Sequence, residues 1–110
     1  MEASEVQRLA RNEAFFREVN ERIDDVAASL GDDDHGYEYV CECSNPACTE
    51  RIELTRAAYE HVREDGTRFV LAPGHVTEAI ESVVEREDEH VLIEKTGAAA
   101  QIVTALDPRA

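Results

Sequence analysis

Near the start of this chain, four apolar residues recur every seven positions: Leu9, Phe16, Ile23 and Leu30. Val19 and Val26 follow the second and third of them by three positions, which is the spacing of one face of an α-helix. No proline interrupts residues 2–30, and Gly31 stands where a helix commonly ends. The pattern therefore predicts one helix over residues 2–30, about 40 Å long, in a chain of only 110 residues.

The apolar face of this helix can be covered in two ways. A single domain of this size has a radius of gyration of about 13 Å, so a helix of about 40 Å is expected to extend past it. We expect residues 1–14 to form a helical extension and residues 16–30 to pack on the domain's own sheet. The heptad spacing also fits a homodimer in which the N-terminal helices of two chains pair.

The rest of the chain combines short helix and strand signals. Thr55 is a suitable N-cap for a short helix over residues 56–64, and residues 98–106 have the composition of a C-terminal helix. Further segments have the alternating or continuous apolar character of strands: residues 37–43, 51–54, 69–72, 80–87 and 90–95. The predicted fold class is α+β, a single domain with a mostly antiparallel sheet of about five short strands. Its expected parts are a helical extension, a core with a metal-binding loop, and a C-terminal helix with a tail: residues 1–14, 15–95 and 96–110.

The composition limits the classes of partner. The chain has 25 Asp and Glu against 11 Lys and Arg, a net charge of −14, and 43% hydrophobic residues. The hydrophobic content is sufficient for a folded core, whereas the charge opposes contact with DNA or RNA, which requires an electropositive face. Charged residues interrupt every apolar stretch, so we expect no membrane-spanning segment and no secretory signal. These features predict an acidic cytoplasmic protein whose charge favours basic partners.

All three cysteines lie within eight residues, as Cys41-x-Cys43-x4-Cys48. An odd, clustered set is more typical of metal ligands in a reducing compartment than of disulfides. Cys41 and Cys43 would project from the same face of an extended backbone, and Asn45-Pro46 can turn Cys48 back toward them. We expect zinc, because it accepts thiolate and imidazole ligands in closed tetrahedral sites. The same spacing also fits three reduced, partly buried thiols, or a redox pair.

A closed zinc site needs a fourth ligand, and the chain has four histidines. His75 follows Pro73-Gly74 after an apolar strand, where a rigid turn would hold its ring at the edge of the sheet. We expect His75 to complete the site, with His61 on the short helix as the alternative. His35 and His90 are expected to be solvated. The predicted metal ligands are therefore Cys41, Cys43, Cys48 and His75.

Several short segments between Phe15 and Lys95 form a wider pattern: residues 15–23, 41–43, 48, 54–55, 59, 62–63, 68–70, 73–75, 83–86 and 91–95. The most specific are Cys-Glu-Cys at 41–43 and Pro-Gly-His at 73–75. Together they resemble a family of small uncharacterised bacterial proteins. The resemblance gives no indication of a particular activity. It implies the same four metal ligands, Cys41, Cys43, Cys48 and His75.

A zinc ion held by four protein ligands has no open position for water or substrate, and such a site stabilises a fold instead of catalysing a reaction. We therefore expect a zinc-binding domain that is not an enzyme and that has a protein-interaction or regulatory role. A thiol/zinc redox sensor is one alternative. A zinc-dependent hydrolase is another if His75 is not a ligand, with Glu42 or Glu50 as the base, although no recognised catalytic motif supports it.

Overall fold

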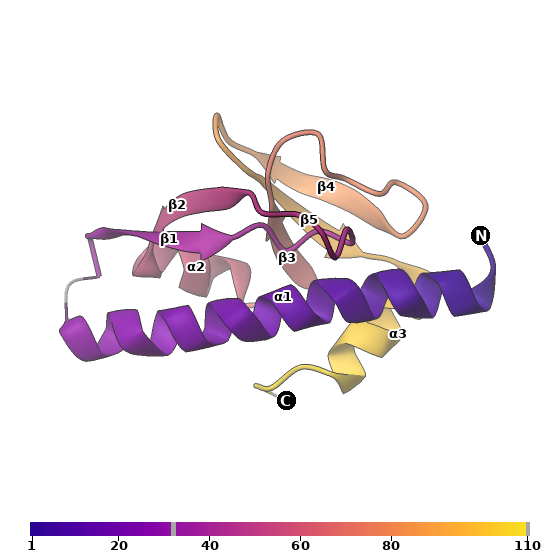
Figure 1. Ribbon diagram of the computed structural model, residues 1–110, viewed down its shortest axis with the longest axis horizontal. Helices are drawn as coiled ribbons and strands as arrows, with labels where there is room; N and C mark the ends of the chain where they lie inside the picture. Colours follow the sequence, from indigo (N-terminus) through magenta and orange to yellow (C-terminus); the bar gives the residue numbers. More distant parts are fainter. Residues whose placement is uncertain (32, 110) are drawn as a thin grey trace.

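Figure 1 shows the computed structural model of the chain, which describes residues 1–31 and 33–109. Helix α1 (Ala3–Leu30) runs along the length of the molecule, whose longest dimension is 43 Å. It ends at Gly31, which adopts the left-handed conformation with φ of 77° and donates its N–H to the carbonyl oxygen of Ala28. The helix predicted from the apolar repeat is confirmed.

Two small antiparallel sheets lie along one side of α1 (Figure 1). The first pairs β1 (Gly36–Val40) with β2 (Arg51–Thr55). The second has the order β3-β5-β4, from three strands: β3 (Arg68–Leu71), β4 (Glu81–Arg86) and β5 (Val91–Lys95). The predicted α+β class and antiparallel pairing are confirmed. The strands form two sheets, however, because the chain between β1 and β2 leaves the first sheet and reaches β3 of the second.

Two shorter helices complete the described part of the chain, α2 (Arg56–Val62) and α3 (Gly97–Ala105). The hydroxyl of Thr55 accepts a hydrogen bond from the backbone N–H of Ala58 at 3.1 Å, which confirms the predicted N-cap of α2. Helix α3 packs against α1 and also contacts β5 (Figure 1). The sheets and α3 therefore share the buried face of α1, whose Arg17 reaches both the carbonyl oxygen of Val103 on α3 and the ring of Phe69 on β3.

The hydrophobic core lies between α1 and the two sheets. Strands β3 and β5 contribute five of its buried side chains: Phe69, Val70, Leu71, Leu92 and Ile93. The rings of Tyr39 on β1 and Tyr59 on α2 stack with their centroids 4.6 Å apart. The continuous apolar character of residues 69–72 thus corresponds to a strand that is buried along almost its full length.

The buried face of α1 is not its most apolar face. Its buried residues are alanines and polar or charged residues: Ala10, Glu13, Ala14, Arg17, Asn20, Asp24 and Ala27. By contrast, Val26 and Leu30 are 62% and 65% exposed. The expectation that residues 16–30 pack on the domain's sheet through their apolar repeat is therefore correct for Ile23, which packs against the core, and wrong for Val26 and Leu30. The buried polar groups find partners on other elements, and the small alanines allow close packing, so the apolar stripe is left outside.

The first turns of α1 do not project freely from the domain. Val6 and Leu9 pack against the core, and Ala10 is fully buried. This corrects the expected overhang, because these side chains join the core and α1 also packs against α3. No helix in the described part of the chain combines the length and apolarity needed to cross a membrane.

Candidate metal centre

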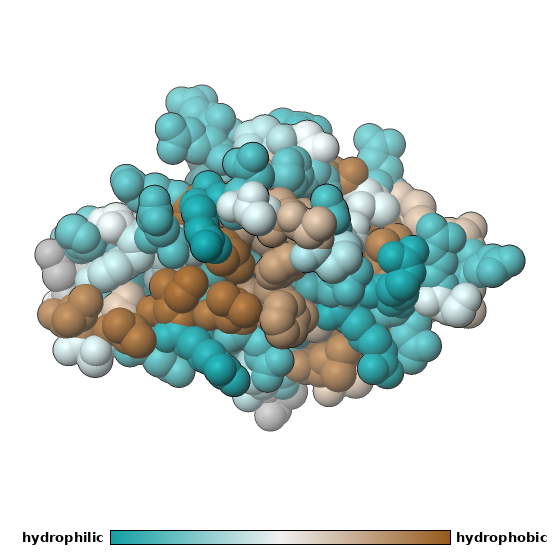
Figure 2. All heavy atoms as spheres, viewed as in Figure 1, coloured by the Kyte–Doolittle hydropathy of each residue, from teal (hydrophilic) through white to brown (hydrophobic). Residues whose placement is uncertain are grey.

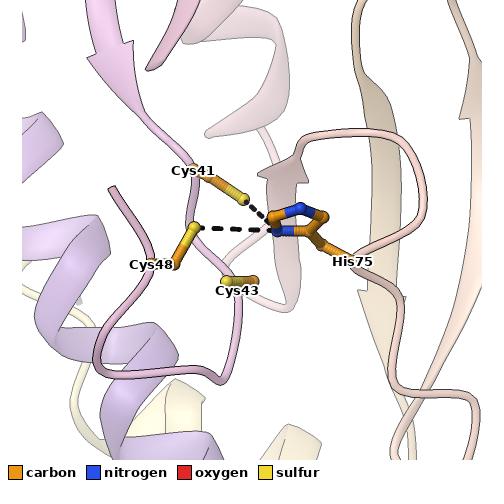
Figure 3. Close-up of side chains that lie close together, drawn as sticks. All are labelled: Cys41, Cys43, Cys48 and His75. Atoms are coloured by element: carbon orange, nitrogen blue, oxygen red, sulfur yellow. Dashed lines mark hydrogen bonds between the residues drawn. The ribbon is translucent and has the colours of Figure 1, made fainter. Parts of the chain in front are cut away.

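The cysteine loop starts where β1 ends, and it connects the two sheets. The N–H of Cys41 donates to the carbonyl oxygen of Glu50 at 3.0 Å, and the N–H of Glu42 donates to that of Val70 at 2.9 Å. The regular strand therefore stops at Val40, three residues earlier than the predicted end at Cys43. The alternation of side chains nevertheless continues: Glu42 points into the core, whereas its two cysteine neighbours face the loop after β3 (Figure 3).

A turn at Asn45 brings the third cysteine back to the first two. The side-chain oxygen of Asn45 accepts the N–H of Ala47 at 3.0 Å, and its carbonyl oxygen accepts the N–H of Cys48 at 3.0 Å. These hydrogen bonds close the chain within four residues. The turn predicted at Asn45-Pro46 thus places Cys48 beside the other sulfur atoms.

His75 enters the cluster from the turn that follows β3. Its N–H donates to the carbonyl oxygen of Ala72 at 3.2 Å, and Gly74 has a φ of 85°, which favours glycine at this position. The imidazole Nδ1 lies 3.6 Å from Sγ of Cys41 and 3.6 Å from Sγ of Cys48. Figure 3 shows the ring directed at the sulfur atoms from the opposite loop.

The four side chains form one compact group. One ligand atom from each of Cys41, Cys43, Cys48 and His75 lies within 4.8 Å of all the others. With Zn–S near 2.3 Å and Zn–N near 2.0–2.1 Å, tetrahedral angles place a sulfur and a nitrogen about 3.6 Å apart and two sulfurs about 3.8 Å apart. The two 3.6 Å separations between sulfur and nitrogen therefore match a tetrahedral centre. The widest separation needs to contract by about 1 Å to complete it.

The environment of the sulfurs combines burial with hydrogen-bond donors. Cys41 and Cys43 are 1% and 2% exposed, whereas Cys48 and His75 are half-buried. The backbone N–H of Ala72 donates to Sγ of Cys41 at 3.2 Å. A hydrogen bond with Cys41 lowers the pKa of Cys43 to about 5, and the same bond together with burial raises the pKa of Cys41. The lowered pKa of Cys43 favours its thiolate, the form of cysteine that binds metals.

Polar contacts also join the two loops beside the cluster. The hydroxyls of Ser44, in the cysteine loop, and Thr77, just after His75, lie 3.0 Å apart. A shallow groove of about 300 Å³ borders the cluster on this side, and residues of both loops line it: Cys43, Ser44, Asn45, Gly74, His75, Val76 and Thr77. The two loops are thus held together by contacts other than those of the four candidate ligands.

Glu42 has a structural position that the sequence does not reveal. Its side chain is fully buried and accepts hydrogen bonds from Asn20 Nδ2 at 2.9 Å, from the hydroxyl of Tyr59 at 2.8 Å and from the N–H of Val70 at 3.0 Å. It therefore faces away from the sulfurs and has no access to water. The hypothesis that Glu42 acts as the base of a hydrolase is wrong for this arrangement. Alternation with two cysteines is the only sequence signal that could have placed Glu42 in the core.

The other histidines lie outside the cluster. His61 is half-exposed, and its two ring nitrogens lie 2.7 Å from a carboxylate oxygen of Glu64 and 3.2 Å from one of Glu85. These carboxylates raise the pKa of His61. The ring of His35 packs edge-on against that of Tyr37. Of the two histidines considered as the fourth ligand, the structure therefore brings only His75 to the cysteines.

Comparisons with protein-family models, with curated proteins and with solved structures found no match. The resemblance to a family of small bacterial proteins stays a prediction. The candidate metal centre is therefore argued from its own geometry, namely four ligand atoms that two loops, 27 or more residues apart along the chain, bring together.

Proposed function

We propose that Cys41, Cys43, Cys48 and His75 bind one zinc ion, and that this ion stabilises a small domain with a protein-interaction or regulatory role. The observation that carries the proposal is the approach of His75 Nδ1 to 3.6 Å from two of the sulfurs. Three thiolates and an imidazole are soft and borderline ligands, which zinc accepts in structural sites. Four protein ligands occupy every tetrahedral position, so we propose no catalytic role.

The position of the site supports a structural role. Its three cysteines lie between β1 and β2 of the first sheet, and His75 follows β3 of the second. A bound ion therefore links the two sheets at the point where their backbones already meet. Binding of a structural zinc ion contributes about 10–16 kcal/mol in small peptides, as much as the stability of a whole domain. Such a contribution offsets the repulsion within a chain of net charge −14.

Native mass spectrometry of the untagged chain with added zinc tests this proposal. We expect one zinc ion per chain, and we expect Cys48→Ser to abolish binding because two thiolates and one imidazole leave the site incomplete. His75→Ala should weaken zinc retention more than His61→Ala, since His61 lies outside the cluster. The reverse order, or an unchanged affinity in His75→Ala, would contradict the proposed ligand set.

A thiol/zinc redox sensor is a second candidate, supported by the close approach of the three sulfurs and the partial exposure of Cys48. Hydrogen peroxide would accept two electrons from two thiols, which form a disulfide and release the zinc ion while the peroxide is reduced to two water molecules. Zinc content, thiol number and circular dichroism before and after peroxide distinguish the two roles. Retention of zinc with unchanged thiols and fold would exclude the sensor.

A further inference from the structure

Helix α1 presents an apolar stripe to the outside of the molecule. Its most exposed members, Phe15, Val26 and Leu30, are 61%, 62% and 65% exposed, and Phe16, Val19 and Ile23 are half-buried. Figure 2 shows apolar atoms along the half of α1 that is nearer its C-terminal end. These six residues are called the α1 stripe below. The opposite face of α1 is already buried by the sheets and α3, and of the six stripe residues only Ile23 packs against the core within the described part of the chain.

Hollows lie along the α1 stripe, between its side chains. One groove of about 340 Å³ has an almost wholly apolar lining: Arg22, Ile23, Val26, Ala27, Leu30 and Tyr37. A second groove of about 320 Å³ follows it toward the N-terminus: Phe15, Glu18, Val19, Arg22 and Ile23. Side chains that project beside hollows at heptad spacing are the arrangement by which two helices interlock. The surface of the stripe is thus complementary to another helix with the same pattern.

The charges beside the α1 stripe nearly balance. The solvent side of α1 carries three exposed arginines and three exposed acids: Arg8, Arg11, Arg22, Glu5, Glu18 and Asp25. The chain as a whole has a net charge of −14. Like charge opposes the approach of two acidic copies, and this repulsion is weaker where exposed charges of both signs lie together, as they do beside the stripe. The α1 stripe therefore combines an apolar surface with weaker charge repulsion between two copies.

We propose that the α1 stripe is the contact surface of a homodimer in which the stripes of two copies pack against each other. A fully exposed aromatic side chain offers about 150–250 Å² and an aliphatic one roughly half as much, so at the exposures given above the six side chains contribute about 250–500 Å² per chain. Two copies then bury about 500–1,000 Å² in total from these side chains, which is the range of weak interfaces. The dimer should accordingly be of micromolar affinity, and it does not depend on the zinc proposal.

Sedimentation equilibrium of the full untagged chain, over a range of protein and salt concentrations, tests this proposal. We expect the mass to approach twice the 12.3 kDa of one chain as the concentration rises to about 300 μM. Added salt should strengthen the dimer, because it screens the repulsion between two acidic chains. A basic partner on the same surface would instead bind more weakly in salt. A chain that stays monomeric at about 300 μM would overturn the proposal.

Two matched variants identify the surface. Val26→Lys introduces a charge into the α1 stripe and should weaken the dimer at least tenfold, about 1.4 kcal/mol, although it lowers the net negative charge. Ala28→Lys makes the same charge change at an exposed residue about 200° around the helix, and should leave the affinity within about twofold. Circular dichroism verifies that both variants are folded, and Phe15→Lys repeats the test at a second exposed position. A dimer that Val26→Lys and Phe15→Lys leave intact would place the interface elsewhere and overturn the proposal.

Discussion

Glu42 shows how a single residue can couple the candidate metal loop to the core. Its backbone N–H bonds to the carbonyl oxygen of Val70, and its carboxylate accepts the N–H of the same residue, so both directions of hydrogen bonding join it to β3. Burial raises the pKa of Glu42, whereas its three hydrogen-bond donors lower it. A carboxylate at this depth is tolerated only because each oxygen has a partner.

Replacing Glu42 should therefore be costly. Glu42→Leu keeps a side chain of similar volume but leaves donors of Asn20, Tyr59 and Val70 without an acceptor in the core. We expect the free energy of unfolding to fall by about 3 kcal/mol or more, as measured by urea denaturation. Glu38→Leu, at an exposed position of β1, is the control and should change stability by less than about 1 kcal/mol. Equal effects would show that burial of Glu42 contributes little.

At the scale of elements, the sequence predicts the bounds of α1 but not which of its faces is buried. The apolar repeat and Gly31 are local signals, and they correctly predict where the helix lies along the chain. Which face is buried depends on partners that lie far away in sequence. Arg17, for example, donates to the carbonyl oxygens of Gly66 and Val103 at 2.6 and 2.7 Å, and its guanidinium lies over the ring of Phe69. Periodicity gives the spacing of a face but carries no information on such partners.

Asp24 on α1 provides a test by pH. Its carboxylate accepts the hydroxyl of Tyr39 at 3.0 Å, with guanidinium nitrogens of Arg56 and Arg109 at 3.8 and 3.5 Å. Burial, followed by a hydrogen bond with Glu60, raises the pKa of Asp24 from 3.8 to about 6. Protonation of Asp24 therefore adds to the free energy of unfolding. This contribution is fully present below the pKa of Asp24 in the unfolded chain, 3.8, and is lost as the pH rises through about 6.

Asp24→Asn removes this titration, because an amide is neutral throughout. The wild type loses stability as the pH rises and the variant does not, so the free energy of unfolding of the variant minus that of the wild type should increase between about pH 4 and pH 7. We expect an increase on the order of 1 kcal/mol, because solvent and the two guanidinium groups reduce the effect. Urea denaturation at both pH values measures the difference. Asp25→Asn makes the same substitution at the exposed neighbouring position and is the matched control. A difference for Asp24→Asn that does not change with pH would contradict the assigned cause.

For the whole molecule, the residues of the candidate site are easier to predict from the sequence than the division of the strands into two sheets. The four predicted ligands do lie together, because metal ligation restricts residue type and spacing and both are visible in the chain. The division of five strands into two sheets is not visible, since it depends on the loop after Val40 pairing with β3 through Glu42. The same loop therefore determines both the topology and the position of the sulfurs.

This shared role leads to a prediction for metal removal. If zinc links the sheets, a chelator should destabilise the junction between them first, since the N–H groups of Cys41, Glu42 and Ala72 bond within or beside the cluster. Hydrogen exchange of these three amides should accelerate by at least about tenfold, whereas amides in the contact between α1 and α3 should change less. The melting temperature should fall by about 10 °C or more, because several kcal/mol of unfolding free energy are lost.

Uniform acceleration of exchange over the whole chain would instead show that the domain unfolds as one unit without the ion. An unchanged exchange pattern and melting temperature, in a chain shown to have lost its zinc, would mean that the hydrogen bonds of Glu42, Ser44 and Thr77 suffice to join the sheets.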